Sequence, residues 1–318
     1  FIASRYGKSA LLGGIVTVIA VIGILPYISL QLKAVSNSFA ILVQFPEIIM
    51  PDKVGAGSIR EDAALWMALL LAAFTIAFGT RHLDAAEHHQ GMVAAIAFES
   101  LVKLLAFLAV GVFVTWGIYD GFGDLFARAA AQPKLKAMMA PLEGVAGDYA
   151  NWAWLTVLSM MAIMFLPRQF QVAVVENIDE RHLNKAIWLF PLYMLAINVF
   201  VLPIAFAGLL VFPEAGAGAD GFILRLPLFF NNQLISVIVF LGGFSAATAM
   251  IVVDSLALSK MITNDIILPM LLRRRRMEDI YWITLFYTRL AMLAVVALGF
   301  AWARMEHGQL LLVEMGLL

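Results

Sequence analysis

The sequence predicts an all-α polytopic membrane protein, because it is rich in apolar residues, poor in charged residues and divided into long apolar runs. Hydrophobic residues make up 63% of the chain and charged residues 14%. Soluble globular domains contain roughly 45–50% apolar and 25% charged residues. A helix that crosses a bilayer needs about 20 consecutive apolar residues. We identify seven such runs and the start of an eighth, which excludes a soluble globular fold.

The apolar runs alternate with polar segments along the chain. The first follows a polar opening, and the second contains no charged residue. The third contains Glu99 and Lys103, the fourth contains Pro167, and the sixth is unusually long and contains Asp254. The predicted spans are residues 9–42, 63–78, 92–119, 152–175, 186–212, 233–272 and 281–303, with an eighth that begins near residue 309.

We expect one transmembrane domain over residues 1–318 that is cut at both ends, since the chain opens at Phe1 and no signal peptide precedes the first run. The absence of Cys excludes disulfides and thiolate metal sites. A formal net charge of -1 gives no indication of a nucleic-acid partner. The lipid bilayer is the first partner that the composition predicts.

Basic residues predict the orientation, since Lys and Arg are enriched in cytoplasmic loops. Four consecutive arginines, residues 273–276, directly follow the sixth run, and Arg5 and Lys8 precede the first. These positions place the N-terminus in the cytoplasm. The same cluster fits contact with anionic lipid headgroups. The outer loop at 120–151 predicts surface helices joined by turns, and the loop at 211–220 is rich in Gly, Ala and Pro.

Two runs carry residues that interrupt helices. Pro167 is followed at once by Arg168 in the fourth run, and Gly242 and Gly243 lie in the sixth. Broken helices near the bilayer midplane bind substrate and ions in secondary transporters. The alternatives are a proline kink and close packing of neighbouring helices through small residues.

Several segments resemble the sodium/solute symporter family. They are Arg5-Tyr6-Gly7-Lys8 with residues 25–32, residues 91–99, Phe165-Leu166-Pro167-Arg168-Gln169-Phe170, and Ser245-Ala246-Ala247-Thr248 continuing to Thr263-Asn264-Asp265. Their order and spacing agree with the family over most of the chain. The resemblance implies the five-plus-five inverted-repeat, LeuT-like fold, with core helices three to nine present and the tenth begun. It also implies a small organic solute as substrate.

Other segments are more closely similar to the symporter-like membrane domains of CbrA-type sensor histidine kinases. These are residues 79–84, 97–104 and 243–250. The similarity implies a multi-pass domain of the bacterial inner (cytoplasmic) membrane, fused to a kinase that signals to a response regulator. Residues 1–318 contain neither a phosphoacceptor-His segment nor an ATP-binding domain, so this part of the protein is not expected to be an enzyme.

Glu99 and Lys103 are candidates for ion or proton coupling. They lie four residues apart in an apolar run, where an unpaired charge costs about 2.5–3.5 kcal/mol on insertion scales. Proton relay is one interpretation, and a static ion pair is the other. Asp254 is a further candidate, either as an ion or proton site or as the partner of Arg289 on the following run.

The resemblance, aligned backward from Thr263-Asn264-Asp265, places Ala249 and Met250 at the hydroxyl pair of the family's sodium site, with Ser245 and Thr248 nearby. Sodium is therefore expected at Ala246 and Ala249 if it binds. Because the hydroxyl pair is missing, either the helix register differs or sodium binding is weakened or lost. In the second case the ammonium group of Lys103 could replace the sodium ion and couple transport to protons. Na⁺ or H⁺ is therefore the expected coupling ion, with no other cofactor.

The family's substrate site lies beside the broken sixth core helix. This predicts substrate contacts at Gln31, Ser159, Met160, Met161, Met164 and Phe165. Methionines are also common as adaptable apolar filler.

The loop residues His82, Asp84, Glu87, His88 and His89 form the most metal-like cluster, but the other His-rich segments of a membrane metalloenzyme are missing. A hydrated loop is the preferred interpretation. The leading hypothesis for function is secondary active transport of a small organic solute, and analogy alone suggests an amino acid such as histidine. The alternative is a sensory membrane domain of a two-component histidine kinase.

Overall fold

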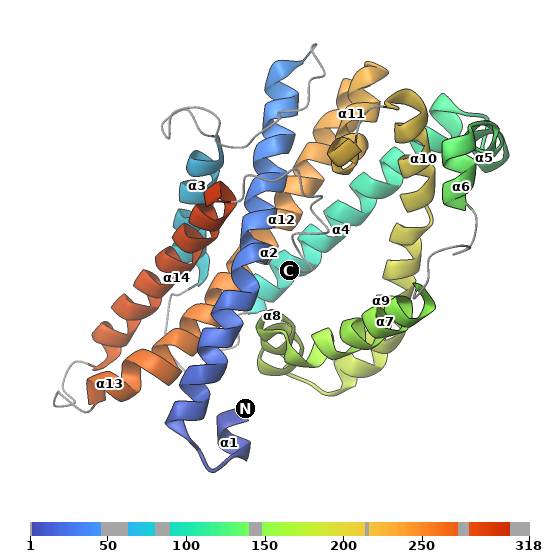
Figure 1. Ribbon diagram of the computed structural model, residues 1–318. Helices are drawn as coiled ribbons and strands as arrows, with labels where there is room; N and C mark the ends of the chain where they lie inside the picture. Colours follow the sequence, from blue (N-terminus) through green and yellow to red (C-terminus); the bar gives the residue numbers. More distant parts are fainter. Residues whose placement is uncertain are drawn as a thin grey trace.

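The computed structural model describes residues 2–45, 63–79, 90–139, 148–213, 216–272 and 280–305. These residues form helices joined by short connections, with no β-strand in the described ranges (Figure 1). The helices are α1 (Ile2–Arg5), α2 (Ala10–Gln44), α3 (Ala63–Gly79), α4 (Gln90–Val112), α5 (Phe122–Ala131), α6 (Pro133–Met139), α7 (Asp148–Phe165), α8 (Pro167–Phe170), α9 (Arg181–Asn198), α10 (Val201–Val211), α11 (Phe222–Phe229), α12 (Gln233–Met261), α13 (Leu268–Leu272) and α14 (Ile280–Met305). Three π-helical turns, η1 (Phe113–Ile118), η2 (Gln171–Val175) and η4 (Ile262–Ile267), extend α4, α8 and α12, and η3 (Gly216–Gly221) is a 3₁₀ turn.

Five helical segments are long and apolar enough to cross a bilayer, so the protein is an integral, polytopic membrane protein. They are Ala10–Val43, Val93–Ile118, Arg181–Val211, Gln233–Leu271 and Tyr281–Met305. They confirm five of the seven predicted spans. The other two form shorter apolar helices, Leu65–Ala77 and Trp152–Met161. The start of the eighth run lies outside the described residues.

Helix α12 connects two apolar cores. On one side it packs with α2, α3 and α14, where Ile28 and Leu32 of α2 and Ile251 and Leu258 of α12 are almost fully buried. On the other side its first half packs with α4 and α11, next to a core that also includes α5, α6 and α10. Figure 1 shows α2 and α12 running side by side through the middle of the molecule.

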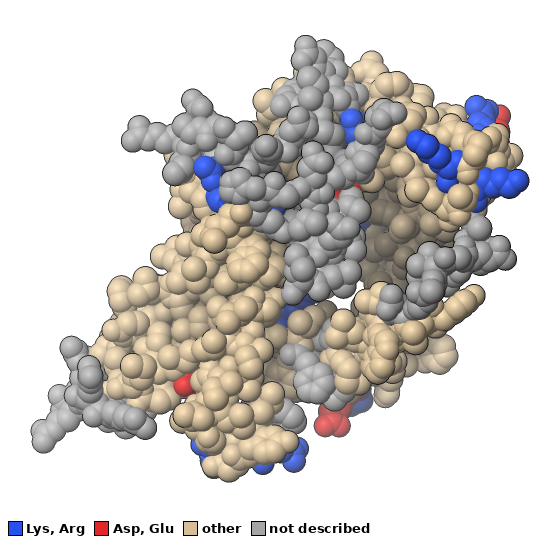
Figure 2. Space-filling model, in the orientation of Figure 1, with Lys and Arg blue, Asp and Glu red and all other residues tan. Residues whose placement is uncertain are grey.

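The outer surface of the helices is apolar. Many large hydrophobic side chains are exposed, among them Leu11, Trp188 and Leu234, each more than 70% exposed. In Figure 2 most of the visible face carries uncharged side chains, and basic side chains gather over α5 and α6. An exposed apolar surface of this extent is stable in lipid rather than in water.

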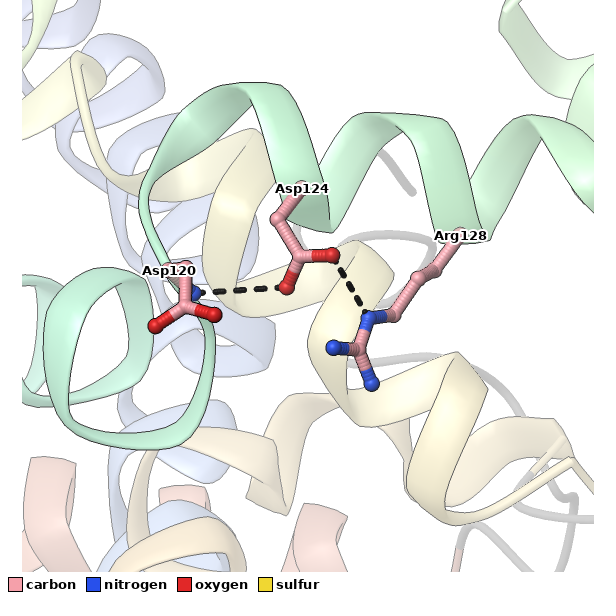
Figure 3. A network of polar contacts seen from close by, with 3 residues as sticks. All are labelled: Asp120, Asp124 and Arg128. Atoms are coloured by element: carbon pink, nitrogen blue, oxygen red, sulfur yellow. Dashed lines mark hydrogen bonds and ion pairs between the residues drawn. The ribbon is translucent and has the colours of Figure 1, made fainter.

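The predicted surface helices at 120–151 are confirmed in part as α5 and α6, while residues 140–147 lie outside the described ranges. Gly121 precedes α5 with φ 102°, a left-handed conformation that glycine adopts without strain. The Asp124 carboxylate accepts the backbone N–H of Asp120 at 3.3 Å and Nε–H of Arg128 at 2.8 Å (Figure 3). The hydrogen bond from Arg128 lowers the pKa of Asp124 below its usual value.

The two predicted helix interruptions have different outcomes. The fourth run does break: Leu166 is extended, with φ −70° and ψ 125°, and Pro167 begins α8. Proline suits this position because it has no N–H to donate. At Gly242 and Gly243 no break occurs, since α12 is continuous there, and the alternative of close packing through small residues applies. Gly242 instead allows close packing, because a Cβ atom at this position would lie 2.7 Å from Cβ of Ala106 on α4.

Candidate functional site

A buried polar cluster joins the helix break to α2 and α12. The guanidinium carbon of Arg168 lies 4.2 Å from the centre of the Tyr27 ring. Nη1 of Arg168 lies 3.7 Å from Oδ2 of Asp254, whose side chain is only 2% exposed. The cluster therefore connects α8 to two long helices of the molecule.

The local sequence explains how these three side chains meet. Pro167 ends the preceding helix and starts α8. Arg168 is the next residue, so its side chain projects from the first turn of α8, directly after the break. Tyr27 follows Pro26, which removes one backbone hydrogen bond from the interior of α2. Asp254 lies in the most buried part of α12, where residues 251–259 are all buried. A carboxylate there is stable only with a compensating charge or an ion nearby.

The contact between Arg168 and Asp254 is loose. Charge-assisted N–H···O bonds are about 2.7–2.9 Å long, whereas Nη1 and Oδ2 are 3.7 Å apart. Both atoms are buried and neither makes a hydrogen bond. Nη1 of Arg168 is a donor and Oδ2 of Asp254 is an acceptor, and both lack a partner. An ion, a water molecule or a solute could therefore bind to them.

Polar and polarisable neighbours surround the ion contact. The Tyr27 hydroxyl donates to Sδ of Met250 at 2.8 Å. Gln31 and Arg168 also lie near the Tyr27 hydroxyl. Gln31 follows Tyr27 by four residues on α2, and Asp254 follows Met250 by four on α12, so each pair shares one helix face. The predicted substrate residue Gln31 and the predicted ion residue Asp254 therefore belong to one cluster.

Lys103 lies beside this cluster, and Glu99 does not join it. The charges of Lys103 and Arg168 are close enough to interact. In the described part of the chain no ion pair connects Glu99 to Lys103, and the buried Oε2 of Glu99 makes no hydrogen bond. The static ion pair is therefore not formed here, while the coupling role of each residue stays a prediction.

The predicted sodium-site residues lie on the unbroken part of α12. Thr248 is buried and its hydroxyl donates to the Phe244 carbonyl at 2.8 Å, while Ser245, Ala246 and Ala249 are half-buried. Their role in binding sodium stays a prediction.

Three of the predicted substrate residues on α7, Ser159, Met160 and Met161, have exposed side chains, and their role in binding substrate stays a prediction. The Ser159 hydroxyl donates to its own helix at the Leu155 carbonyl, and Met160 and Met161 are 62% and 41% exposed. The side chains of Met164 and Phe165 lie outside the described set. The metal-like loop with His82, Asp84, Glu87, His88 and His89 also lies outside it, and the described residues contain no cluster of metal ligands.

Arg168 and Tyr27 were not predicted as site residues. Arg168 was noted only beside Pro167 at the interruption of the fourth run, and Tyr27 only within the resembling segment 25–32. Two signals could have identified Arg168: it follows a proline inside an apolar run, and Asp254 at membrane depth needs a counter-charge.

Comparison with known proteins gives one distant relative. The chain is 26% identical over 232 residues to an uncharacterized symporter, YhjB, of Bacillus subtilis (strain 168). The match covers 72% of this chain but only 42% of the relative. No protein-family model and no solved structure matches the chain. The chain is thus distantly similar to a symporter, and the LeuT-like fold and the kinase relationship stay expectations.

Proposed function

We propose that the protein carries out secondary active transport of a small organic solute, coupled to Na⁺ or H⁺ by alternating access. The observation that carries this proposal is the Arg168–Asp254 contact at the break between α7 and α8. Ionisable residues at membrane depth are costly and mark ion or substrate paths. The distant similarity to a symporter supports the same class of function.

The cluster offers a physical route for coupling. Asp254 has oxygen atoms suited to binding a sodium ion or a proton. Binding of either cation neutralises the carboxylate and weakens its attraction for Arg168. Arg168 belongs to α8, which has no buried residue of its own. A change of charge at Asp254 therefore alters how firmly α8 is held against α12, and a cation is able to bias the position of the broken helix.

Uptake by the full-length protein tests the proposal. Cells or proteoliposomes containing it are supplied with a panel of radiolabelled amino acids and other small organic solutes, while sodium and pH are varied separately. We expect concentrative uptake of at least one solute that depends on a sodium or proton gradient. Asp254→Asn should abolish concentrative uptake, whereas Asp179→Asn, an exposed surface change, should not.

One outcome would contradict the proposed transport function. No uptake of any solute, together with solute-dependent kinase output from the full-length protein, would identify a sensory membrane domain. Gradient-driven uptake that persists in Asp254→Asn would support transport but place the coupling ion elsewhere.

A further inference from the structure

We propose that Arg168 binds the carboxylate group of the solute, so that the substrates are small organic monocarboxylates. This inference rests on the proposed transport function, because it names the substrate class of the same site. It is carried by an imbalance of charge and by an unsatisfied guanidinium group.

The charges around Arg168 do not cancel. Arg168 and Lys103 interact as two cations, and the acidic side chain in contact with Arg168 is Asp254. Glu99 makes no ion pair with Lys103 in the described ranges. The local excess is one positive charge. In a region of low dielectric constant this excess favours a bound group with one negative charge.

The geometry of Arg168 selects the kind of anion. The guanidinium carbon of Arg168 lies over the Tyr27 ring, 4.2 Å from its centre, and the N–H donors of a guanidinium lie in its own plane. Nη1 is buried and makes no hydrogen bond. A carboxylate can accept two parallel hydrogen bonds from a guanidinium edge. A neutral solute could accept a hydrogen bond from Nη1 but would leave the charge uncompensated.

Asp254 competes for the same guanidinium group. Its carboxylate approaches Nη1 only to 3.7 Å, so it occupies the neighbourhood of Arg168 without forming a short ion pair. Removing its charge should therefore strengthen the binding of a solute carboxylate, even though it abolishes coupling. Neutralising Arg168 should weaken that binding. The two substitutions should therefore change the affinity for a solute carboxylate in opposite directions. A general folding defect would lower the affinity in both variants.

Ligand-induced thermal shifts of the purified full-length protein provide the test. The probes are propionate, L-alanine, L-proline and other small carboxylates, each paired with its primary amide, with sodium chloride as an inorganic anion. We expect stabilisation by at least one carboxylate and not by its amide. Arg168→Gln should weaken the apparent affinity for that carboxylate about tenfold or more, since a charge-assisted hydrogen bond is lost. Asp254→Asn should strengthen it, and the exposed control Arg181→Gln should leave it unchanged.

The opposing outcomes separate this inference from the proposed function. No carboxylate-specific shift across the panel, equal shifts with chloride, or an unchanged affinity in a folded Arg168→Gln variant would overturn carboxylate recognition. Uptake of neutral solutes by such a variant would still support transport. Carboxylate-specific binding without uptake of any probe would overturn transport and retain the recognition.

Discussion

Replacing Gly242 by alanine should destabilise the contact between α12 and α4. The new Cβ atom would lie 2.7 Å from Cβ of Ala106, about 1 Å closer than the optimal separation of roughly 3.5–4.0 Å between carbon atoms. Its nearest backbone atoms are Cα of Lys103 and the Val102 carbonyl oxygen, both at 3.7 Å. The two helices must therefore move apart, and overpacking of this kind costs about 1–3 kcal/mol.

Gly243 provides a matched control in the next position of the same helix. A Cβ atom at Gly243 meets nothing within 4 Å. Both substitutions gain the same helix propensity, at most about 1 kcal/mol for Gly→Ala. The difference between the two variants isolates the steric effect, so Gly242→Ala should be less stable than Gly243→Ala by about 1–3 kcal/mol.

Thermal unfolding of the purified full-length protein measures this difference. We expect a lower melting temperature for Gly242→Ala than for Gly243→Ala, and partial recovery when Ala106→Gly is added to Gly242→Ala. Equal melting temperatures, or no recovery in the double variant, would refute the packing of Gly242 against Ala106. Because Lys103 lies at the same contact, Gly242→Ala should also reduce uptake more than Gly243→Ala does.

Three further predictions concern other contacts. Thr17→Val should destabilise the protein by about 1 kcal/mol and Thr17→Ser should not, because the Thr17 hydroxyl lies 3.2 Å from Oδ2 of Asp265; unfolding in denaturant compares them. The lowered pKa of Asp124 means that its contact with Arg128 stabilises α5 above the usual carboxyl pKa and is lost as the pH falls through the lowered value. Fluorescence of Trp116, whose ring contacts Phe122, should report this acid transition in the wild type and not in Asp124→Asn. Pro167→Ala should strongly reduce uptake while leaving the melting temperature nearly unchanged, because it permits a continuous helix across Leu166. A variant with full uptake would contradict a role for the break.

The sequence was sufficient to predict five of the seven spans and one of the two breaks. Apolar runs predict spans because a lipid-exposed backbone must form its hydrogen bonds within the helix. Pro167 predicts a break because its ring cannot continue the preceding turn. Gly242 was harder to interpret, since glycine permits both a break and close packing. The side chain it faces, Ala106, lies on another helix and is not evident from local sequence.

For the candidate site, too, the sequence predicts charged residues within apolar runs but not which residues they contact. Asp254 and Lys103 stand out because charged residues are rare in apolar runs. The partner of Asp254 could not be predicted in this way: Arg289 and Arg168 are both basic residues near apolar runs, and only the packing of α8 against α12 brings Arg168 into contact. The exposed positions of Met160 and Met161 likewise depend on where α7 lies, which hydropathy does not encode.

The attachment of α8 links this packing to the proposed mechanism. Helix α12 is held by two apolar cores, whereas α8 contributes no buried residue to either. Its polar connections to the long helices include the contact of Arg168 with the Tyr27 ring and with Asp254. Interactions of this kind respond to charge, while apolar cores do not. A cation at Asp254 or a carboxylate at Arg168 should therefore shift α8 relative to α12 and leave the pairing of α12 with α2 intact.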